Sequence, residues 1–590
     1  MKNLIKPIGL VGGRNGAIIV DGIADGYEPF ALAQIVEELA PDQPLVFVMR
    51  DGQRLSAIAE GLRFVMPGLP VLELPAWDCL PYDRVSPGAD AAARRLDALN
   101  AMVALRGAPH RAVVLVTANA LMQRMPPAEQ IQAQGFRARP GNQVDMEALV
   151  VRLEKGGFER VPTVRDIGQF AVRGGILDLF APGWEEALRL DFFGDTLESV
   201  RAFDVATQRT TGQRNEMSLQ AMSEVTLTPE TISRFRRNYI EAFGAPSRDD
   251  ALYAAVSEGR RFAGMEHWLP LFYEALETVF DYLPDAPFVF DHLAQEAIGE
   301  RHVLIKDHFE ARTRQLSGES GLGEAVPYKP VEPRRLYLAP EEVLAAAQSR
   351  PFIRFTPFAT PQEGAARVLH AGAQAGRGFA EERADPNANV FDHVVKHIGT
   401  LRSNGKQVLI AGWSEGSADR LGQILGEHGL GAVTRVENLD ALKKLPQGQA
   451  GLGILPLEAG FETEHLAVVA EQDILGDRLV RRTKKRRKAS DFISEVNALS
   501  AGDIVVHADH GIGRFVGLRT IEAAGAPQEC LELRYAGDDR LFLPVENIEL
   551  LSRYGSDAAE AVLDKLGGVA WQSRKAKLKK RLLEMAGQLI

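Results

Sequence analysis

Short β-rich runs alternate with helix-like stretches in the first part of the chain. The β-rich runs are AIIVDGI (17–23), PLVFVM (44–49), PVLELP (70–75) and AVVLVTA (112–118). Apolar positions recur at helical spacing in two of the stretches between them, 30–40 and 89–106. This alternation predicts a parallel sheet that is covered by helices.

The pattern changes further along the chain. From about residue 145 to 230, strand-like segments joined by Gly, Pro and Asp turns predict a small mixed or antiparallel module. Helices then return with one apolar strand at 287–291, and a further α/β segment follows. Its core candidates are KQVLIAGW (406–413), GLGILPL (451–457) and LAVVAEQDIL (466–475). A chain of 590 residues with these changes is expected to be multidomain, with α/β and α+β parts.

The last part of the chain differs from everything before it. Residues 481–488 are basic at seven of eight positions, which is typical of a linker but also of a phosphate-binding segment. Closely spaced short strands then predict a small β-barrel. A basic amphipathic helix runs to Ile590 without a stop signal. We therefore expect the natural protein to continue, although a frayed natural C-terminus fits the same pattern.

Composition narrows the class of protein. The net charge is -11, so any contact with nucleic acid has to come from a local basic patch. The two cysteines, Cys79 and Cys530, are too few for a disulfide framework. The sequence contains neither a signal-peptide core nor an apolar run of the roughly 20 residues that span a bilayer. These features favour a cytoplasmic protein without a membrane partner.

A glycine-rich turn, LVGGRNGAIIV, places Gly12, Gly13 and Gly16 where bare backbone N–H groups could approach a phosphate. A working phosphate loop also needs a lysine and a hydroxyl directly after its last glycine, and the sequence has Ala17 and Ile18 there. We expect a degenerate nucleotide loop that is inactive, with no catalytic residues, no cofactor and no metal site in this chain.

Two segments have the residue types of protein-binding surfaces. Along 165–204, Arg173, Arg189 and Phe193 belong to types that are enriched in binding hot spots. The alternative is that Phe193 is core and the arginines are solvated surface. The run RTIEAAGA is β-prone and ends in a small-residue turn, so it fits a free strand edge that accepts a partner strand. The alternative there is an edge that is paired within its own domain.

Several motifs occur in an order that resembles the transcription-repair coupling factor (Mfd) family. They are LPAWDCLPYDRVSP, FAVRGGILDLF, RLDFFGDTLESVRAFD, EHWLPLFY, VVHADHGIGRFVGL and LRYAGDDRLFLPVENIELLSRY. The first three also resemble the excision-repair protein UvrB. The resemblance extends from about residue 9 to the end of the chain, and its last part is similar to a CarD-type domain.

The resemblance implies a domain layout. It places the first part of a degenerate UvrB-like (RecA-like) α/β domain at 1–140, an inserted UvrA-recruiting module at 145–230, the second part of the UvrB-like domain at 235–345, a family-specific α/β domain at 350–475, a basic linker at 476–497, an RNA-polymerase-interacting β-barrel of the Tudor/CarD type at 498–553, and the start of a helix leading to a motor at 567–590.

The resemblance also implies site residues. The family's interface arginines and aromatic residue toward UvrA fall on Arg173, Arg189 and Phe193. The apolar residue that docks on the polymerase β subunit falls on Ile521, where leucine is also seen. Its neighbours on the same strand edge are Arg519, Thr520 and Glu522.

The function that the resemblance implies is transcription-coupled repair. The family's full-length form is a DNA translocase that uses ATP and Mg²⁺, and its Walker and helicase motifs do not occur in these residues. We expect this chain to bind the polymerase and UvrA, and DNA at most weakly. Two other functions stay open: a stand-alone polymerase-binding regulator, and a UvrB-like helicase or ATPase.

Overall fold

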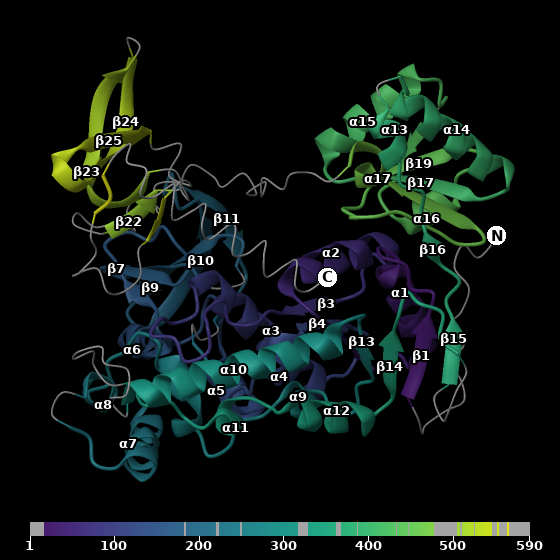
Figure 1. Cartoon of the computed structure of the whole chain (residues 1–590). Coiled ribbons are helices and arrows are strands. Elements are labelled where there is room, and N and C mark those ends of the chain that lie inside the picture. The colour runs from purple at the N-terminus through teal and green to yellow at the C-terminus, as the bar shows by residue number, and fades with distance from the viewer. Residues whose placement is uncertain are drawn as a thin grey trace. The chain divides into compact units, whose positions relative to one another are not determined.

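The computed structural model contains two compact units, Met1–Leu479 and Val480–Ile590, which are described separately (Figure 1). The residues that the structure describes are 17–181, 184–219, 223–247, 250–316, 328–361, 367–385, 387–431, 433–446, 448–476, 504–507, 510–523, 526–544, 551–553 and 563–565. The predicted linker block at 481–488, the terminal helix and the glycine-rich turn at Gly12, Gly13 and Gly16 lie outside them.

A seven-stranded parallel sheet forms the centre of the first unit, in the order β15-β1-β14-β13-β2-β4-β3. Its strands are β1 (Ala17–Asp21), β2 (Leu45–Met49), β3 (Val71–Leu74), β4 (Val113–Thr117), β13 (Phe288–Phe290), β14 (Phe352–Phe355) and β15 (Arg367–His370). The four predicted β-rich runs near the N-terminus and the strand at 287–291 are confirmed. Strands β14 and β15 fall within the predicted 350–475 domain but belong to this sheet instead.

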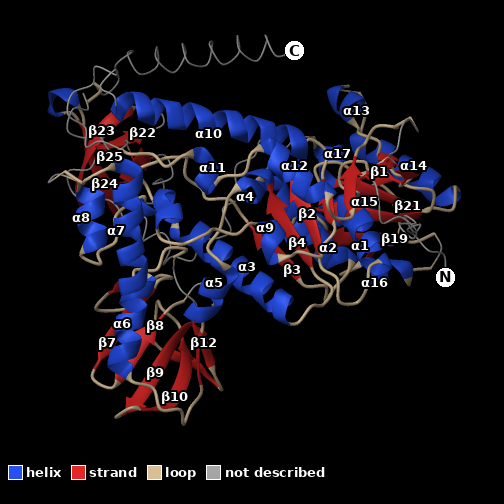
Figure 2. Ribbon diagram, turned by 90° about the horizontal axis from the view of Figure 1, so that it is seen from below, coloured by secondary structure: helices blue, strands red, loops and turns tan. Residues whose placement is uncertain are grey.

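Helices cover both faces of this sheet (Figure 2). Alternate residues of the central strands enter two separate cores: Val46 and Val48 face one, and Phe47 and Met49 face the other. Burial on both sides explains why these strands are continuously apolar. The helices of this part are α1 (Glu28–Glu38), α2 (Gly52–Val65), α3 (Ala89–Gly107), α4 (Ala118–Met122), α5 (Ala128–Gln134), α7 (Pro229–Phe243), α8 (Ala251–Ser257), the 3₁₀ helix η1 (Met265–Leu271), α9 (Val279–Tyr282), α10 (Ala294–Leu316), α11 (Pro333–Leu336) and α12 (Pro340–Gln348).

A mixed sheet is inserted between β4 and β13, in the order β11-β10-β9-β8-β7-β6. It contains β6 (Glu159–Arg160), β7 (Gln169–Arg173), β8 (Ile176–Leu179), β9 (Ala187–Phe193), β10 (Thr196–Phe203) and β11 (Thr210–Arg214), and one face packs on α6 (Met146–Gly156). The chain enters and leaves this module through a two-stranded antiparallel ribbon, β5 (Phe136–Ala138) with β12 (Met217–Leu219). The predicted small mixed module is confirmed.

A second α/β sheet has the order β16-β20-β21-β17-β19-β18 and shares a core with α1 and α2. Its strands are β16 (Gln374–Ala375), β17 (Gln407–Gly412), β18 (Val433–Arg435), β19 (Ala450–Ile454), β20 (Phe461–Glu462) and β21 (Leu466–Ala470), with helices α13 (Ala380–Ala384), α14 (Val390–Ser403), α15 (Glu415–Glu427), α16 (Leu439–Lys443) and α17 (Glu471–Leu475). The three predicted core strands, β17, β19 and β21, lie side by side and are parallel.

The second unit contains an antiparallel sheet of five described strands, in the order β25-β24-β23-β22-β26. They are β22 (Ile504–His507), β23 (Gly511–Ala523), β24 (Ala526–Arg534), β25 (Arg540–Pro544) and β26 (Leu551–Arg553), with a 3₁₀ turn η2 (Ala536–Asp538). The closely spaced strands predicted for this segment are confirmed. Among all the described residues, no helix is long and apolar enough to cross a membrane.

Candidate functional site

The inserted sheet has one apolar face and one polar face. Phe170, Leu177, Leu190 and Val200 point into the core beneath α6. Successive side chains of a strand point to opposite faces, so the intervening positions form the second face, where charged residues lie beside a small buried cluster of Ala171, Ala187 and Phe203. This second face holds Arg173, Asp178, Arg189, Asp191 and Arg201.

Asp178 is the centre of the polar face. Its carboxylate accepts hydrogen bonds from Arg189 Nε at 2.7 Å and Nη2 at 2.9 Å, and from Arg173 Nη2 at 3.1 Å. The carboxylate is buried, and only 17% of the Arg189 side chain is exposed, against 51% for Arg173. Arg189 also lies over the ring of Phe203, with 4.8 Å from Cζ to the ring centroid. The hydrogen bond and charge of Asp178 raise the pKa of Arg189.

Phe193 projects from the end of the same sheet. It ends β9 at a tight turn in which Gly194 has φ +57°, and 76% of its surface is exposed. Arg173 and the partly exposed Ile176 flank the neighbouring hairpin turn at this sheet end. Gly175 is needed in that turn because an added Cβ would lie 2.6 Å from the Phe192 carbonyl oxygen. An exposed aromatic ring and a half-exposed guanidinium at one sheet end are residue types that are enriched in protein-binding surfaces.

The three predicted residues therefore differ in role. Phe193 and Arg173 are accessible, whereas most of Arg189 is buried and holds Asp178 in place. Sequence reasoning missed Asp178 and Ile176. The signal for Asp178 was present, because it is the one charged residue in the apolar strand ILDL. We call Arg173, Ile176 and Phe193, together with the Asp178–Arg189 pair beneath them, the Phe193 face.

Replacing Asp178 by asparagine should destabilise the inserted module by about 1.5–3 kcal/mol. The substitution removes the charged acceptor of both arginines and leaves the mostly buried Arg189 without its counter-charge. Hydrogen exchange of β7–β10 measures the loss. The matched control is Glu216→Gln, whose exposed pair with Arg139 should contribute less than about 1 kcal/mol. Equal protection in the two variants would contradict a supporting role for Asp178.

The predicted strand edge in the second unit lies on β23. Its first residues, Gly511–Arg514, pair with β22, and Arg514–Ala523 pair with β24. Within the described residues, the segment from Phe515 onward therefore has a hydrogen-bonded strand on one side only. Ile521 lies opposite Gln528, Thr520 opposite Glu529 and Glu522 opposite Pro527; the exposed Arg519 has its Nε 2.7 Å from Oε2 of the buried Glu532.

The loop that joins the first strand of the large sheet to a helix is Gly22–Tyr27, between β1 and α1. Gly12, Gly13 and Gly16 precede β1, whereas a phosphate loop follows a strand and opens a helix. The beginning of α1 carries Glu28, which is buried and pairs with Arg54. A negative charge at this helix start opposes the binding of a second anion such as phosphate.

Arg54 joins three carboxylates at this edge of the sheet. It contacts Asp25 at 2.9 Å, Asp291 at 2.8 Å and Glu28. Asp51 caps α2 by accepting hydrogen bonds from the backbone N–H groups of Gln53 and Arg54, which fixes the start of the helix that carries the guanidinium. Burial raises the pKa of Glu28 to about 8, although Arg54 opposes that shift. Burial likewise raises the pKa of Asp291.

Two family models match parts of the chain. A model described as UvrB interaction domain matches residues 136–224, which include the Phe193 face. A model described as CarD-like/TRCF RID domain matches residues 499–555, which include β23.

Curated relatives match almost the whole chain. A transcription-repair-coupling factor of Myxococcus xanthus is 33% identical over 98% of this chain and 50% of its own length. Those of Rickettsia bellii and Escherichia coli are 31% and 30% identical, over 93% and 95% of this chain and 46% and 47% of their own lengths. The chain spans about half the length of the curated relatives it matches. Over most of its length the chain is thus similar to about half of a transcription-repair-coupling factor, and two of its segments match the models described as UvrB interaction domain and CarD-like/TRCF RID domain.

Proposed function

We propose that this chain links a stalled RNA polymerase to nucleotide excision repair. It binds the polymerase β subunit along the edge of β23 around Ile521, and it binds UvrA through the Phe193 face. The observation that carries the proposal is the exposed Phe193 at the same sheet end as the half-exposed Arg173, inside the segment that matches a UvrB interaction domain. Aromatic residues and arginine are enriched at the centres of protein interfaces.

Within these residues we assign binding rather than ATP hydrolysis. The sequence has no complete GxxxxGK[ST] motif, and acidic side chains line the beginning of α1. In this proposal, ATP-driven movement on DNA belongs to the full-length members of the family, and this chain holds no resident cofactor. The alternative of a UvrB-like ATPase predicts measurable binding of ATP by this chain, which isothermal titration tests directly.

The link itself is tested by a bridging experiment. UvrA is immobilised, and purified RNA polymerase is added with or without the chain. We expect the polymerase to be retained only when the chain is present. Retention of the chain on polymerase but not on UvrA would instead favour the stand-alone regulator.

Replacing Phe193 by alanine should weaken UvrA binding by about 30-fold, which corresponds to the loss of about 2 kcal/mol at a hot spot. Arg173→Ala should have a smaller effect, because this side chain is half exposed and shares Asp178 with Arg189. Surface plasmon resonance on immobilised UvrA measures both. The matched control is Phe358→Ala, which removes another exposed phenylalanine outside the module and should leave the affinity unchanged. Equal affinities for the Phe193 and Phe358 variants would refute the assignment of this surface.

A further inference from the structure

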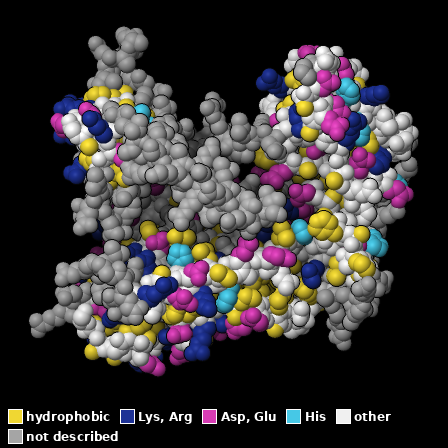
Figure 3. Space-filling view, in the orientation of Figure 1, with side chains coloured by type: hydrophobic (Ala, Val, Ile, Leu, Met, Phe, Trp, Pro, Cys, Tyr) yellow, Lys and Arg dark blue, Asp and Glu magenta, His cyan; other side chains and the backbone are white. Residues whose placement is uncertain are grey.

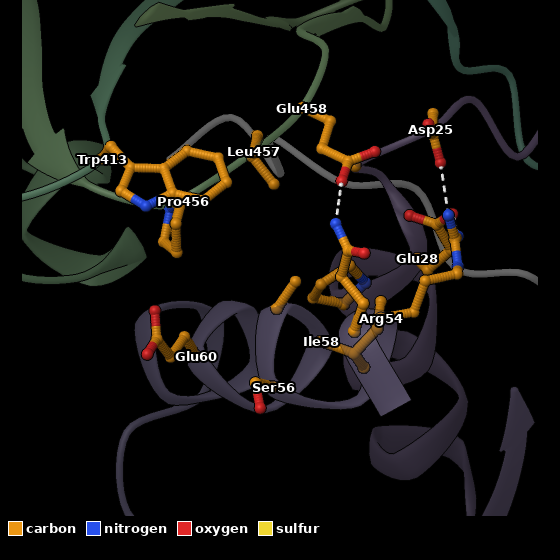
Figure 4. Close-up of a pocket in the computed structure, with 14 residues that line it drawn as sticks. Asp25, Glu28, Arg54, Ser56, Ile58, Glu60, Trp413, Pro456, Leu457 and Glu458 are labelled. Carbon is orange, nitrogen blue, oxygen red and sulfur yellow. Dashed lines mark hydrogen bonds and ion pairs between the residues drawn. The ribbon is translucent and has the colours of Figure 1, made fainter. Parts of the chain in front are cut away.

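A pocket of about 220 Å³ lies where the two α/β sheets of the first unit meet (Figure 4). Asp25, Glu28 and Arg54 line it from the carboxyl ends of β1 and β2, and Trp413 and Glu458 line it from the loops after β17 and β19. A crevice at the carboxyl ends of parallel strands is the usual ligand position in α/β folds. Sheet and helices on both sides share one hydrophobic core, so the pocket is part of a single packed body.

The lining of the pocket is strongly acidic. It contains four carboxylates, Asp25, Glu28, Glu60 and Glu458, and one cation, Arg54, which already pairs with Asp25, Glu28 and Asp291. Acidic side chains also gather over α2 in the space-filling view (Figure 3). Such a lining repels phosphates and other anions and attracts a cation.

Glu28 lines this pocket, and one of its carboxylate oxygens is an unused acceptor. Its side chain is 4% exposed, and its Oε1 pairs with Arg54. Its Oε2 is buried and has no hydrogen-bond partner among the residues that the structure describes. A buried carboxylate oxygen without a donor costs free energy, which a bound cationic donor would recover.

The lining residues fit an organic cation better than a metal ion. In the described part of the chain, no three His, Cys, Asp or Glu side chains are grouped closely enough to hold a metal. The carboxylates are instead distributed around the pocket, and between them lie Trp413, Pro456 and Leu457 (Figure 4). Separated charges around an aromatic and aliphatic wall suit a flexible chain that carries more than one amino group.

We propose that this pocket binds an alkylammonium ion of the polyamine class, with one amino group against Glu28 and the methylene chain along Trp413 and Leu457. A second amino group lies between Glu60 and Glu458. Trp413 adds cation–π attraction to the neighbouring ammonium.

Isothermal titration of the whole chain with spermidine tests the proposal. Trp413→Ala should weaken binding by about 5- to 30-fold, from the loss of the cation–π and methylene contacts. Glu28→Gln should weaken the binding of spermidine at least as much as Trp413→Ala does. In this variant Arg54 still pairs with Asp25 and Asp291. The matched control is Glu341→Gln on α12, which makes the same change of net charge outside the pocket and should leave the affinity unchanged.

The pH dependence gives a second readout. A cation binds the ionised form of Glu28, whose pKa burial raises to about 8, so affinity should rise between about pH 6.5 and 8.5. The charged groups that face Glu28 are Arg54, Asp25 and Asp291. In Glu28→Gln the rise should disappear.

Two probes distinguish the source of the ammonium group. Spermidine and cadaverine represent a free polyamine, and N-acetyl-lysine methylamide represents a lysine side chain of another protein. Tighter binding of the free amines supports the proposal as stated, and tighter binding of the lysine derivative assigns the same pocket to a protein side chain. The proposal is overturned if none of the three amines binds at millimolar concentration. It is also overturned if Trp413→Ala and Glu28→Gln both bind spermidine with wild-type affinity. None of these outcomes depends on UvrA or on the polymerase.

Discussion

Replacing Ile521 by arginine should lower the affinity of this chain for RNA polymerase at least about 100-fold, because it places a charge in an apolar contact. Ile521 lies on the stretch of β23 whose only hydrogen-bonded neighbour among the described strands is β24. A strand with one unpaired side can add a partner strand through its backbone, and the side chains of that edge then select the partner. An arginine there loses hydration without gaining a counter-charge.

The conservative variant Ile521→Leu serves as the control. It keeps an apolar side chain of the same volume and should bind the polymerase within about threefold of the wild type. Binding is measured with purified polymerase by biolayer interferometry, and circular dichroism establishes that both variants keep the sheet of the second unit. If the arginine variant binds as the wild type does, the polymerase contact lies elsewhere.

Replacing Arg54 by alanine should destabilise the first unit by about 3–5 kcal/mol. The guanidinium pairs with two buried carboxylates, Glu28 and Asp291, and with one exposed carboxylate, Asp25. Without it, Glu28 and Asp291 remain buried beside one another with no cation. They connect α1, α2 and β13, so the loss affects the centre of the large sheet rather than one loop.

The loss of stability in Arg54→Ala should be larger at pH 8 than at pH 5. An acid whose folded pKa is raised stabilises the folded state when it is protonated, and this stabilisation is lost as the pH rises through the folded pKa. Because a chain of two units need not unfold in one step, hydrogen exchange of β1, α1 and α2 is the measurement. Arg63→Ala on the same helix removes an exposed ion pair with Glu73 and should cost less than about 1 kcal/mol. A similar loss in both variants would show that the buried cluster contributes little.

Local pattern predicted the elements of this chain well. The strands β2 and β4 are continuous apolar runs between turn residues, and both of their faces are buried. The alternation along β7 to β10 predicted one buried and one displayed face of the inserted sheet, but it left open whether Phe193 is core. The structure exposes Phe193 and half of Arg173.

Contacts between distant segments could not be predicted in the same way. Strands β14 and β15 join β1 although more than 300 residues separate them along the chain, and their short runs are equally compatible with the second α/β sheet. The burial of Arg189 depends on Asp178 across a strand pair and on Phe203. The Arg54 cluster brings together three separate segments, which carry Asp25 with Glu28, Arg54 and Asp291, and none of them has a motif.

The ribbon of β5 and β12 determines how a pull on the inserted module reaches the rest of the protein. The chain enters the module through β5, which follows α5, and leaves it through β12, which precedes α7, so both ends of the module are connected at the same end of the ribbon. A partner that pulls on the Phe193 face therefore loads two chains side by side in the same direction. The two covalent chains carry most of that tension and the hydrogen bonds between β5 and β12 carry little of it. A pull of this direction therefore does not separate the two strands of the ribbon.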